Sequence, residues 1–125
     1  MTSLTELTNG LSEQILYYAT TPDTTELMRL GQKIFTAVLE TRQGILAAEQ
    51  TIEEQEADIL VAVASDNNLS NELKRKAAKQ ALMNEDAILV KAKYQKAQLE
   101  EQLAALEFTA SQCRSLVRLL PSVTN

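Results

Sequence analysis

The chain has 125 residues, a formal net charge of −5, 45% hydrophobic residues and only three Gly and two Pro, which favours one domain built from long regular elements. It contains no His, no Trp and a single Cys, so a His-containing catalytic or di-metal site is excluded and most enzyme mechanisms lack the residues they need. The negative charge argues against a general phosphate-binding surface, because non-specific nucleic-acid affinity depends on Lys and Arg.

An amphipathic helix is predicted over residues 3–19, because apolar side chains recur there at spacings of three and four. They are Leu4, Leu7, Leu11, Ile15 and Tyr18. The segment TTPDTTEL then ends this helix and begins another. The sequence allows two alternative N-caps for the second helix: Thr21 with Pro22 as the first helical residue, or Asp23 paired with Glu26.

A second helix is predicted over residues 24–65, where no Pro occurs and apolar positions alternate at spacings of four and three. This seam consists of Leu27, Gly31, Ile34, Val38, Thr41, Ile45, Ala48, Ile52, Gln55, Ile59 and Ala62. Such spacing is typical of a coiled coil. The segment SDNNLSN follows, and its residues favour a turn and a helix N-cap.

A third, continuous helix is predicted over residues 70–120, ending before Pro121. Its C-terminal seam consists of Leu99, Leu103, Leu106, Ala110, Cys113, Val117 and Leu120. In the same register the upstream seam consists of Leu82, Glu85, Leu89, Ala92 and Lys96. This register places the charged side chain of Glu85 inward.

The sequence therefore predicts an all-α fold, a long antiparallel helical hairpin (coiled coil) with a short N-terminal helix forming a three-helix bundle at one end, in a single domain over residues 1–125. With the turn centred near Asn67 and Asn68, the numbers of facing residues sum to about 135. This alignment places acidic residues level with basic ones. The sets are Glu53, Glu54, Glu56 and Asp58 with Lys74, Arg75, Lys76 and Lys79, and Arg29 and Lys33 with Glu100, Glu101 and Glu107.

The two ends of the hairpin are expected to differ. In the bundle, Gly31 and Gly44 are expected to permit close approach of a neighbouring helix. The core there is predicted to hold Ile34, Phe35, Val38, Leu103, Leu106, Phe108, Val117 and Leu120. At the tip, apolar residues surround the helix, and a helix that is apolar all round is normally buried. The predicted partner-binding residues are Ile59, Leu60, Val61 and Val63, and a second copy of the chain, giving a dimer, is the favoured partner.

A group of acidic residues offers candidate Mg²⁺ ligands, since carboxylates from facing helices bind this ion. The group consists of Glu49, Glu53, Glu56, Glu85 and Asp86. All-helical nucleotide pyrophosphohydrolases of the MazG type use acidic clusters in this style, but their second E-x-x-D pair is absent from the sequence. A solvated acidic face is the favoured interpretation, no cofactor is expected, and a Mg²⁺-dependent nucleotide hydrolase ranks third among the functions.

The basic residues Lys74, Arg75, Lys76 and Lys79 form the candidate surface for phosphate or nucleic acid. No aromatic residue lies beside them for base stacking, and the acidic run predicted opposite would neutralise part of their charge. An accessory nucleic-acid-binding protein is therefore the second functional alternative.

Two further residue types are interpreted as packing residues. Cys113 lies on the predicted seam and, with no His to activate it, is interpreted as a small apolar residue. Tyr17 and Tyr18 are expected to pack against the bundle more readily than to form a contact patch.

From Asn68 onward, NLSNELKRKAAKQALMNED is followed by the charged heptads KAKYQKAQLEEQLAALE and a closing CRSLVRLL. This part of the chain resembles small coiled-coil helical proteins of unknown function that phages and prophages encode. The resemblance covers a little under half of the chain and implies an accessory protein of a phage or mobile element. It transfers no functional residue.

No membrane span is expected, because the longest apolar run covers only residues 59–64. The polar N-terminal segment lacks the pattern of a secretory leader, and Cys113 has no partner for an intrachain disulfide, so a cytoplasmic location is expected. The leading functional prediction is a non-enzymatic protein-interaction or scaffolding module, with coiled-coil faces and the apolar tip as its recognition surfaces.

Overall fold

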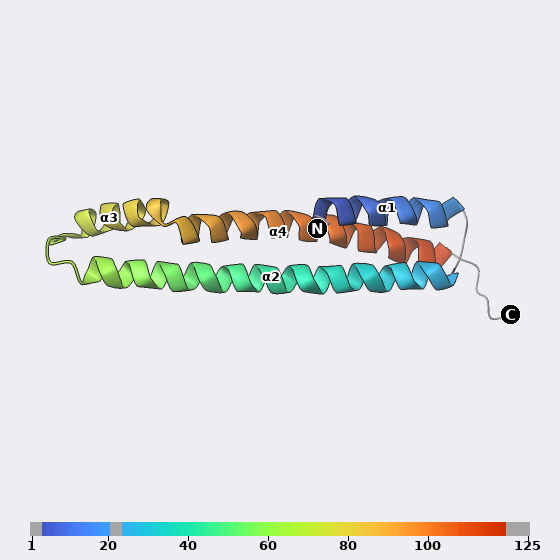
Figure 1. Cartoon of the computed structure of the whole chain (residues 1–125), viewed down its shortest axis with the longest axis horizontal. Coiled ribbons are helices and arrows are strands. Elements are labelled where there is room, and N and C mark those ends of the chain that lie inside the picture. Colours follow the sequence, from blue (N-terminus) through green and yellow to red (C-terminus); the bar gives the residue numbers. More distant parts are fainter. Residues whose placement is uncertain (1–3, 21–23, 120–125) are drawn as a thin grey trace. The chain divides into compact units, whose positions relative to one another are not determined.

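The structure, a computed structural model, describes residues 4–20 and 24–119 and contains four helices and no strand within them. They are α1 (Leu4–Thr20), α2 (Thr24–Ala64), α3 (Glu72–Glu85) and α4 (Ala87–Leu119), shown in Figure 1. The all-α prediction is confirmed. The ranges predicted for the first two helices agree with α1 and α2 to within a residue, whereas the alternative caps at Thr21 and Asp23 lie outside the described residues.

Packing divides the chain into two compact units. Unit 1 comprises Met1–Gln43 and Leu99–Asn125, and unit 2 comprises Gly44–Gln98. Both α2 and α4 contribute to each unit, because each is a continuous helix whose residues fall on both sides of these boundaries. No helix in the described part of the chain combines the length and apolar character that a membrane crossing requires.

The core of unit 1 is built from three helices. Its buried residues are Leu11 and Ile15 of α1, Leu27, Leu30, Ile34, Ala37 and Val38 of α2, and Leu106 and Cys113 of α4. Two buried threonines satisfy their hydroxyl groups within their own helices: Thr41 donates to the carbonyl oxygen of Ala37 at 2.7 Å, and Thr109 donates to that of Ala105 at 2.9 Å. The predicted packing of the first helix against this region is therefore confirmed.

Two aromatic residues predicted for this core lie on its surface instead. The side chains of Phe35 and Phe108 are 63% and 66% exposed. Phe35 directly follows the seam residue Ile34, and Phe108 lies two residues after Leu106. Because each residue along a helix turns the side chain by about 100°, both aromatic rings point away from the seam. Leu30 and Ala37 are buried in their place, so the buried stripe of α2 is wider than the predicted seam. The prediction for Leu120 lies outside the described residues.

The core of unit 2 is smaller and is formed by Ile59 and Val63 of α2 with Leu89 of α4. Half-buried residues pack against it, namely Ile52, Leu69, Ala78 and Met83. Helix α3 has no fully buried residue of its own.

The turn predicted from SDNNLSN is confirmed in unit 2. The Asp66 carboxylate accepts a hydrogen bond from the backbone N–H of Asn68 at 2.9 Å, and the Asp66 carbonyl oxygen accepts one from the N–H of Leu69 at 3.2 Å. Asn71 then caps α3, because its side-chain oxygen accepts from the N–H of Lys74 at 2.8 Å. These local bonds replace the helical ones that end at Ala64.

The prediction of one continuous third helix is wrong, because α3 ends at Glu85 and α4 begins at Ala87. Between them Asp86 adopts an extended backbone with ψ of 105°, and its carboxylate accepts from the N–H of Leu89 at 3.0 Å, as an N-cap does. The break resets the register, so Glu85 is exposed rather than inward while Leu89 is buried.

The predicted alignment of the charged residues is also wrong. It placed Lys93 level with about residue 42, but the Lys93 ammonium lies 4.0 Å from the Glu56 carboxylate, and Arg42 instead contacts Glu107 at 2.9 Å. Within residues 4–20 and 24–119, none of the four acidic residues at 53–58 pairs with the four basic residues of α3, and Arg29 pairs with Glu26 of its own helix. The prediction assumed an unbroken helix after the turn, and the break at Asp86 removes that basis.

Candidate helix-binding groove

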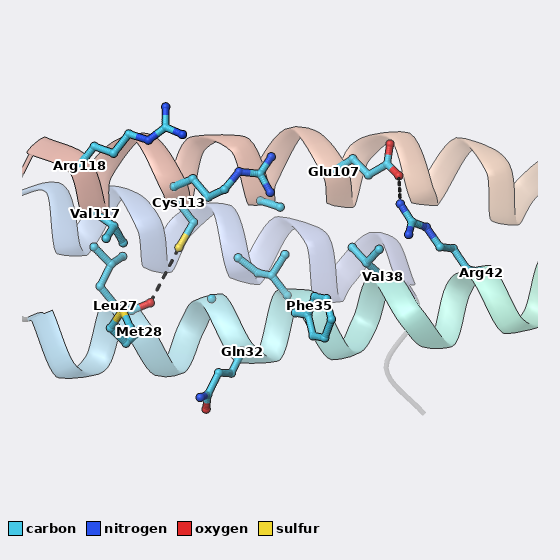
Figure 2. A pocket seen from close by; sticks show the side chains of 14 residues that line it. Leu27, Met28, Gln32, Phe35, Val38, Arg42, Glu107, Cys113, Val117 and Arg118 are labelled. Atoms are coloured by element: carbon cyan, nitrogen blue, oxygen red, sulfur yellow. Dashed lines mark hydrogen bonds and ion pairs between the residues drawn. The ribbon is translucent and has the colours of Figure 1, made fainter.

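An open groove of about 850 Å³ runs between α2 and α4 in unit 1 (Figure 2). Helix α2 lines it with Leu27, Met28, Gly31, Gln32, Ile34, Phe35, Val38 and Arg42. Helix α4 lines it with Glu107, Ala110, Cys113, Arg114, Val117 and Arg118. Most of these side chains are apolar. The charged ones are Arg42 of α2 and Glu107, Arg114 and Arg118 of α4.

The two helices approach closely at Gly31 and Cys113. A methyl group added at Gly31 would lie 3.7 Å from the Cys113 sulfur, which is ordinary van der Waals contact, so the two helices are neighbours here but their approach does not require a glycine. The Cys113 thiol is buried and lies 3.8 Å from the carbonyl oxygen of Leu27, to which it donates a weak hydrogen bond (Figure 2). Gly31 and Cys113 thus lie together at the floor of the groove.

The Cys113 thiol at the floor of the groove is expected to be unreactive. Burial raises the pKa of Cys113, and the neighbouring Arg114 guanidinium lowers it by a smaller amount. A raised pKa keeps the sulfur protonated at neutral pH, and the thiolate is the reactive form. Cys113 therefore contributes an apolar surface, as the sequence indicates.

One wall of the groove carries large apolar side chains that nothing in the described chain covers. Met28 is 55% exposed and Phe35, seven residues later on α2, is 63% exposed. They belong to a second stripe with coiled-coil spacing, one residue beyond the buried seam: Met28, Gln32, Phe35, Leu39 and Arg42. Sequence reasoning assigned Phe35 to the core and missed this stripe, although its alternation of four and three was present in the sequence.

The charges around the groove are unevenly neutralised. Arg42 and Glu107 form an ion pair across it at 2.9 Å, visible in Figure 2. Arg114 and Arg118 of α4 are exposed and form no ion pair with another residue in the described part of the chain. In a chain with a net charge of −5, this wall is locally positive.

The predicted tip residues divide into two pairs. Leu60 and Val61 are exposed on α2, whereas Ile59 and Val63 are buried in the core of unit 2. Ile59 and Val63 share one face of α2, which residues of α4 and α3 cover, and Leu60 and Val61 lie on the uncovered side. Of the four predicted partner-binding residues, only Leu60 and Val61 therefore present exposed side chains, and their binding to a partner stays a prediction.

The basic candidate residues all lie on α3. Lys74, Arg75 and Lys76 are exposed and Lys79 is half-buried. The Arg75 side chain donates from Nε to the carbonyl oxygen of Leu69 at 3.1 Å, so it fastens the turn to the helix. The structure brings the four residues onto one short helix, whose own sequence contains no aromatic residue.

The acidic candidate residues are dispersed. Glu49 pairs with Lys96 at 3.5 Å, Glu56 pairs with Lys93 at 4.0 Å, and the Asp86 carboxylate caps α4. Glu53 and Glu85 are exposed. Across residues 4–20 and 24–119, no three or more Asp, Glu, Cys or His side chains gather closely enough to hold a metal ion.

The tyrosines of α1 are only partly described. Tyr17 is exposed, which contradicts its predicted packing against the bundle, and the side chain of Tyr18 lies outside the described residues. Tyr17 is not among the residues that line the groove.

Neither a protein-family model, nor a curated protein, nor a solved structure matches this chain. The resemblance to phage-encoded coiled-coil proteins therefore stays a prediction. The groove is the feature of the described chain that combines an apolar floor, two exposed apolar side chains and a positive wall.

Proposed function

We propose that this protein is a non-enzymatic interaction module that binds a helix of a partner protein in the groove between α2 and α4 of unit 1. The observation that carries the proposal is the exposure of Met28 and Phe35 along an open apolar groove. Exposed apolar surface that is contiguous and bordered by charged residues is typical of protein-binding sites.

The dimensions of the groove suit a helix. Residues 28–42 of α2 extend over about 21 Å at 1.5 Å per residue, which matches roughly four helical turns. Helices α1, α2 and α4 form the core of unit 1, so a helix in the groove would complete a four-helix arrangement. An amphipathic helix in such a groove buries residues at spacings of three and four.

The exposed side chains are large enough to anchor a partner. Burying the exposed part of Phe35 or Met28 contributes about 1–2 kcal/mol for each side chain, since each is already partly covered. A few such anchors account for most of the binding energy in many interfaces. Met28 is also flexible and polarisable, so it adapts to the side chains that it meets.

The test uses a fluorescently labelled helical peptide of about 16 residues, with leucines on one face at spacings of three and four and uncharged glutamines beside them. In Phe35→Ser, we expect the peptide to bind at least about tenfold more weakly than in the wild type, because roughly 1.4 kcal/mol or more of apolar burial is lost. Fluorescence anisotropy measures the dissociation constant.

Phe108→Ser is the matched control. Phe108 lies in the same unit and is as exposed as Phe35, but it does not line the groove. Its substitution should leave peptide affinity unchanged. A wild-type protein that does not bind the peptide, or equal weakening in both variants, would refute helix binding at this groove.

A further inference from the structure

The charge distribution around the groove identifies the kind of helix that fits it. We propose that the partner helix is acidic: an amphipathic helix of another protein whose apolar stripe packs between α2 and α4, and whose Asp or Glu side chains lie against Arg114 and Arg118. This proposal rests on the proposed function and specifies the partner of the same groove.

The α4 wall carries two positive charges that the described chain does not neutralise. Arg114 and Arg118 both line the groove and are exposed, and neither pairs with another residue within 4–20 or 24–119. Among the described residues that line the groove, Glu107 is the sole acidic one, and it is already paired with Arg42. An occupant therefore meets two unpaired guanidinium groups and no unpaired carboxylate.

The spacing of the two arginines matches the geometry of a helix. Residues four apart in a helix lie one above the other on the same face, so Arg114 and Arg118 form a short positive row along α4. A partner helix lying along this row presents carboxylates three, four or seven residues apart at the same intervals. Arginine binds carboxylates through two parallel N–H···O bonds, which adds orientation to the charge attraction.

The same charges disfavour a second copy of the chain bound groove to groove. A two-fold dimer places the same surface of both copies at one interface, and here that surface contains the unpaired Arg114 and Arg118. Like charges brought together across an interface cost binding energy. The positive wall thus points to an acidic helix from a different protein.

The experiment compares three peptides of about 16 residues that share one leucine stripe and differ only in the residues beside it, which are glutamate, glutamine or lysine. At about 50 mM salt we expect the glutamate peptide to bind about five- to tenfold more tightly than the glutamine peptide, and the lysine peptide to bind more weakly than both. At about 500 mM salt the three affinities should converge, because salt screens the charge contribution.

Two variants test whether Arg114 and Arg118 cause the preference. Arg114→Gln with Arg118→Gln should abolish the difference between the glutamate and glutamine peptides without reducing affinity for the glutamine peptide. Arg114→Glu with Arg118→Glu should reverse it, so that the lysine peptide binds best. Arg29→Gln is the control, since Arg29 is an exposed arginine of unit 1 that does not line the groove, and its substitution should change nothing.

The outcomes separate this inference from the proposed function. Equal binding of the glutamate and glutamine peptides to the wild type overturns the acidic partner and leaves helix binding in place. Failure of all three peptides to bind overturns the proposed function itself. Light scattering decides about a second copy: a wild-type dimer that becomes a monomer in Phe35→Ser would show that the groove is filled by the chain itself, which also overturns the inference.

Discussion

Units 1 and 2 share the two longest helices but are packed very differently. Among the described side chains, the core cluster of unit 1 contains nine buried residues from three helices, whereas that of unit 2 contains three, and α3 contributes no fully buried residue to it. The difference comes from the third element in each unit. Helix α1 adds Leu11 and Ile15 to the unit 1 core, while α3 adds only half-buried side chains to unit 2.

This contrast shows how one sequence pattern supports two kinds of packing. Two facing helices bury a narrow seam, and the seam of α2 continues through unit 2 as Ile45, Ala48 and Ile59. In unit 1 the buried stripe of α2 is wider, since Leu30 and Ala37 are buried beside the seam. We therefore expect unit 1 to supply most of the stability of the chain.

The largest effect should come from removing a fully buried leucine from unit 1. Leu106→Ala is expected to lower the free energy of unfolding by about 3–5 kcal/mol, because a side chain with 0% exposure leaves a cavity among residues of three helices. Leu89→Ala in unit 2, also at 0% exposure, should cost only about 2–3 kcal/mol, since fewer buried neighbours surround the cavity. Urea denaturation followed by circular dichroism measures both.

The control for this pair is Leu119→Ala, because Leu119 is exposed at the end of α4 and its truncation should change stability by no more than about 0.5 kcal/mol. Hydrogen exchange should also be faster in Gly44–Gln98 than elsewhere in Leu89→Ala. If Leu89→Ala proves as costly as Leu106→Ala, the two cores are equally strong and the contrast between the units is wrong.

A smaller effect is expected at the break between α3 and α4 in unit 2. Asp86→Ala removes the carboxylate that accepts from the Leu89 N–H at 3.0 Å, so it should destabilise the chain by about 1 kcal/mol. Asp86→Asn keeps a good N-cap and should be close to neutral. Chemical denaturation distinguishes the two variants, and equal stability of all three proteins would show that the cap is not what maintains the break.

The smallest effect should be a gain in unit 1. Gly31→Ala is expected to stabilise α2 by about 0.5–1 kcal/mol, because alanine has the higher helix propensity and the added methyl group lies at 3.7 Å from the Cys113 sulfur without a clash. Gly10→Ala in α1, where nothing lies within 4 Å of the added group, provides the comparison. Thermal denaturation reports both, and a loss of stability confined to Gly31→Ala would mean that α2 and α4 are closer than contact distance.

The periodic features of this fold are readable from the sequence. The seam of α2 from Leu27 to Ile59 and the C-terminal seam of α4 follow from heptad spacing, and the turn follows from its Asn and Asp residues. These features depend on residues close together in the chain. They are therefore visible without knowledge of the tertiary structure.

The predictions that were wrong concern residues that can adopt either of two local arrangements. Asp86 can either continue a helix or cap one. The spacing of apolar residues around it fits a continuous helix, and only the hydrogen bond from the Leu89 N–H to the Asp86 carboxylate shows that it caps α4. Phe35 was placed in the core on hydrophobicity, although the seam already occupied Ile34 and Val38 and left Phe35 on the neighbouring stripe. Because Phe35 is predicted to be buried, the sequence does not predict the groove. Without the groove, the sequence also gives no reason to select Arg114 and Arg118 as binding residues.

The order in which the two units can form during synthesis follows from their different continuity along the chain. Unit 2 is a single segment, Gly44–Gln98, whereas unit 1 requires residues from both ends of the chain. A nascent chain therefore holds every residue of unit 2 before the Leu106 and Cys113 side of the unit 1 core has been translated. Contacts formed early in unit 2 shorten the loop that α2 and α4 must close, which lowers the entropic cost of completing unit 1 and, with it, the groove.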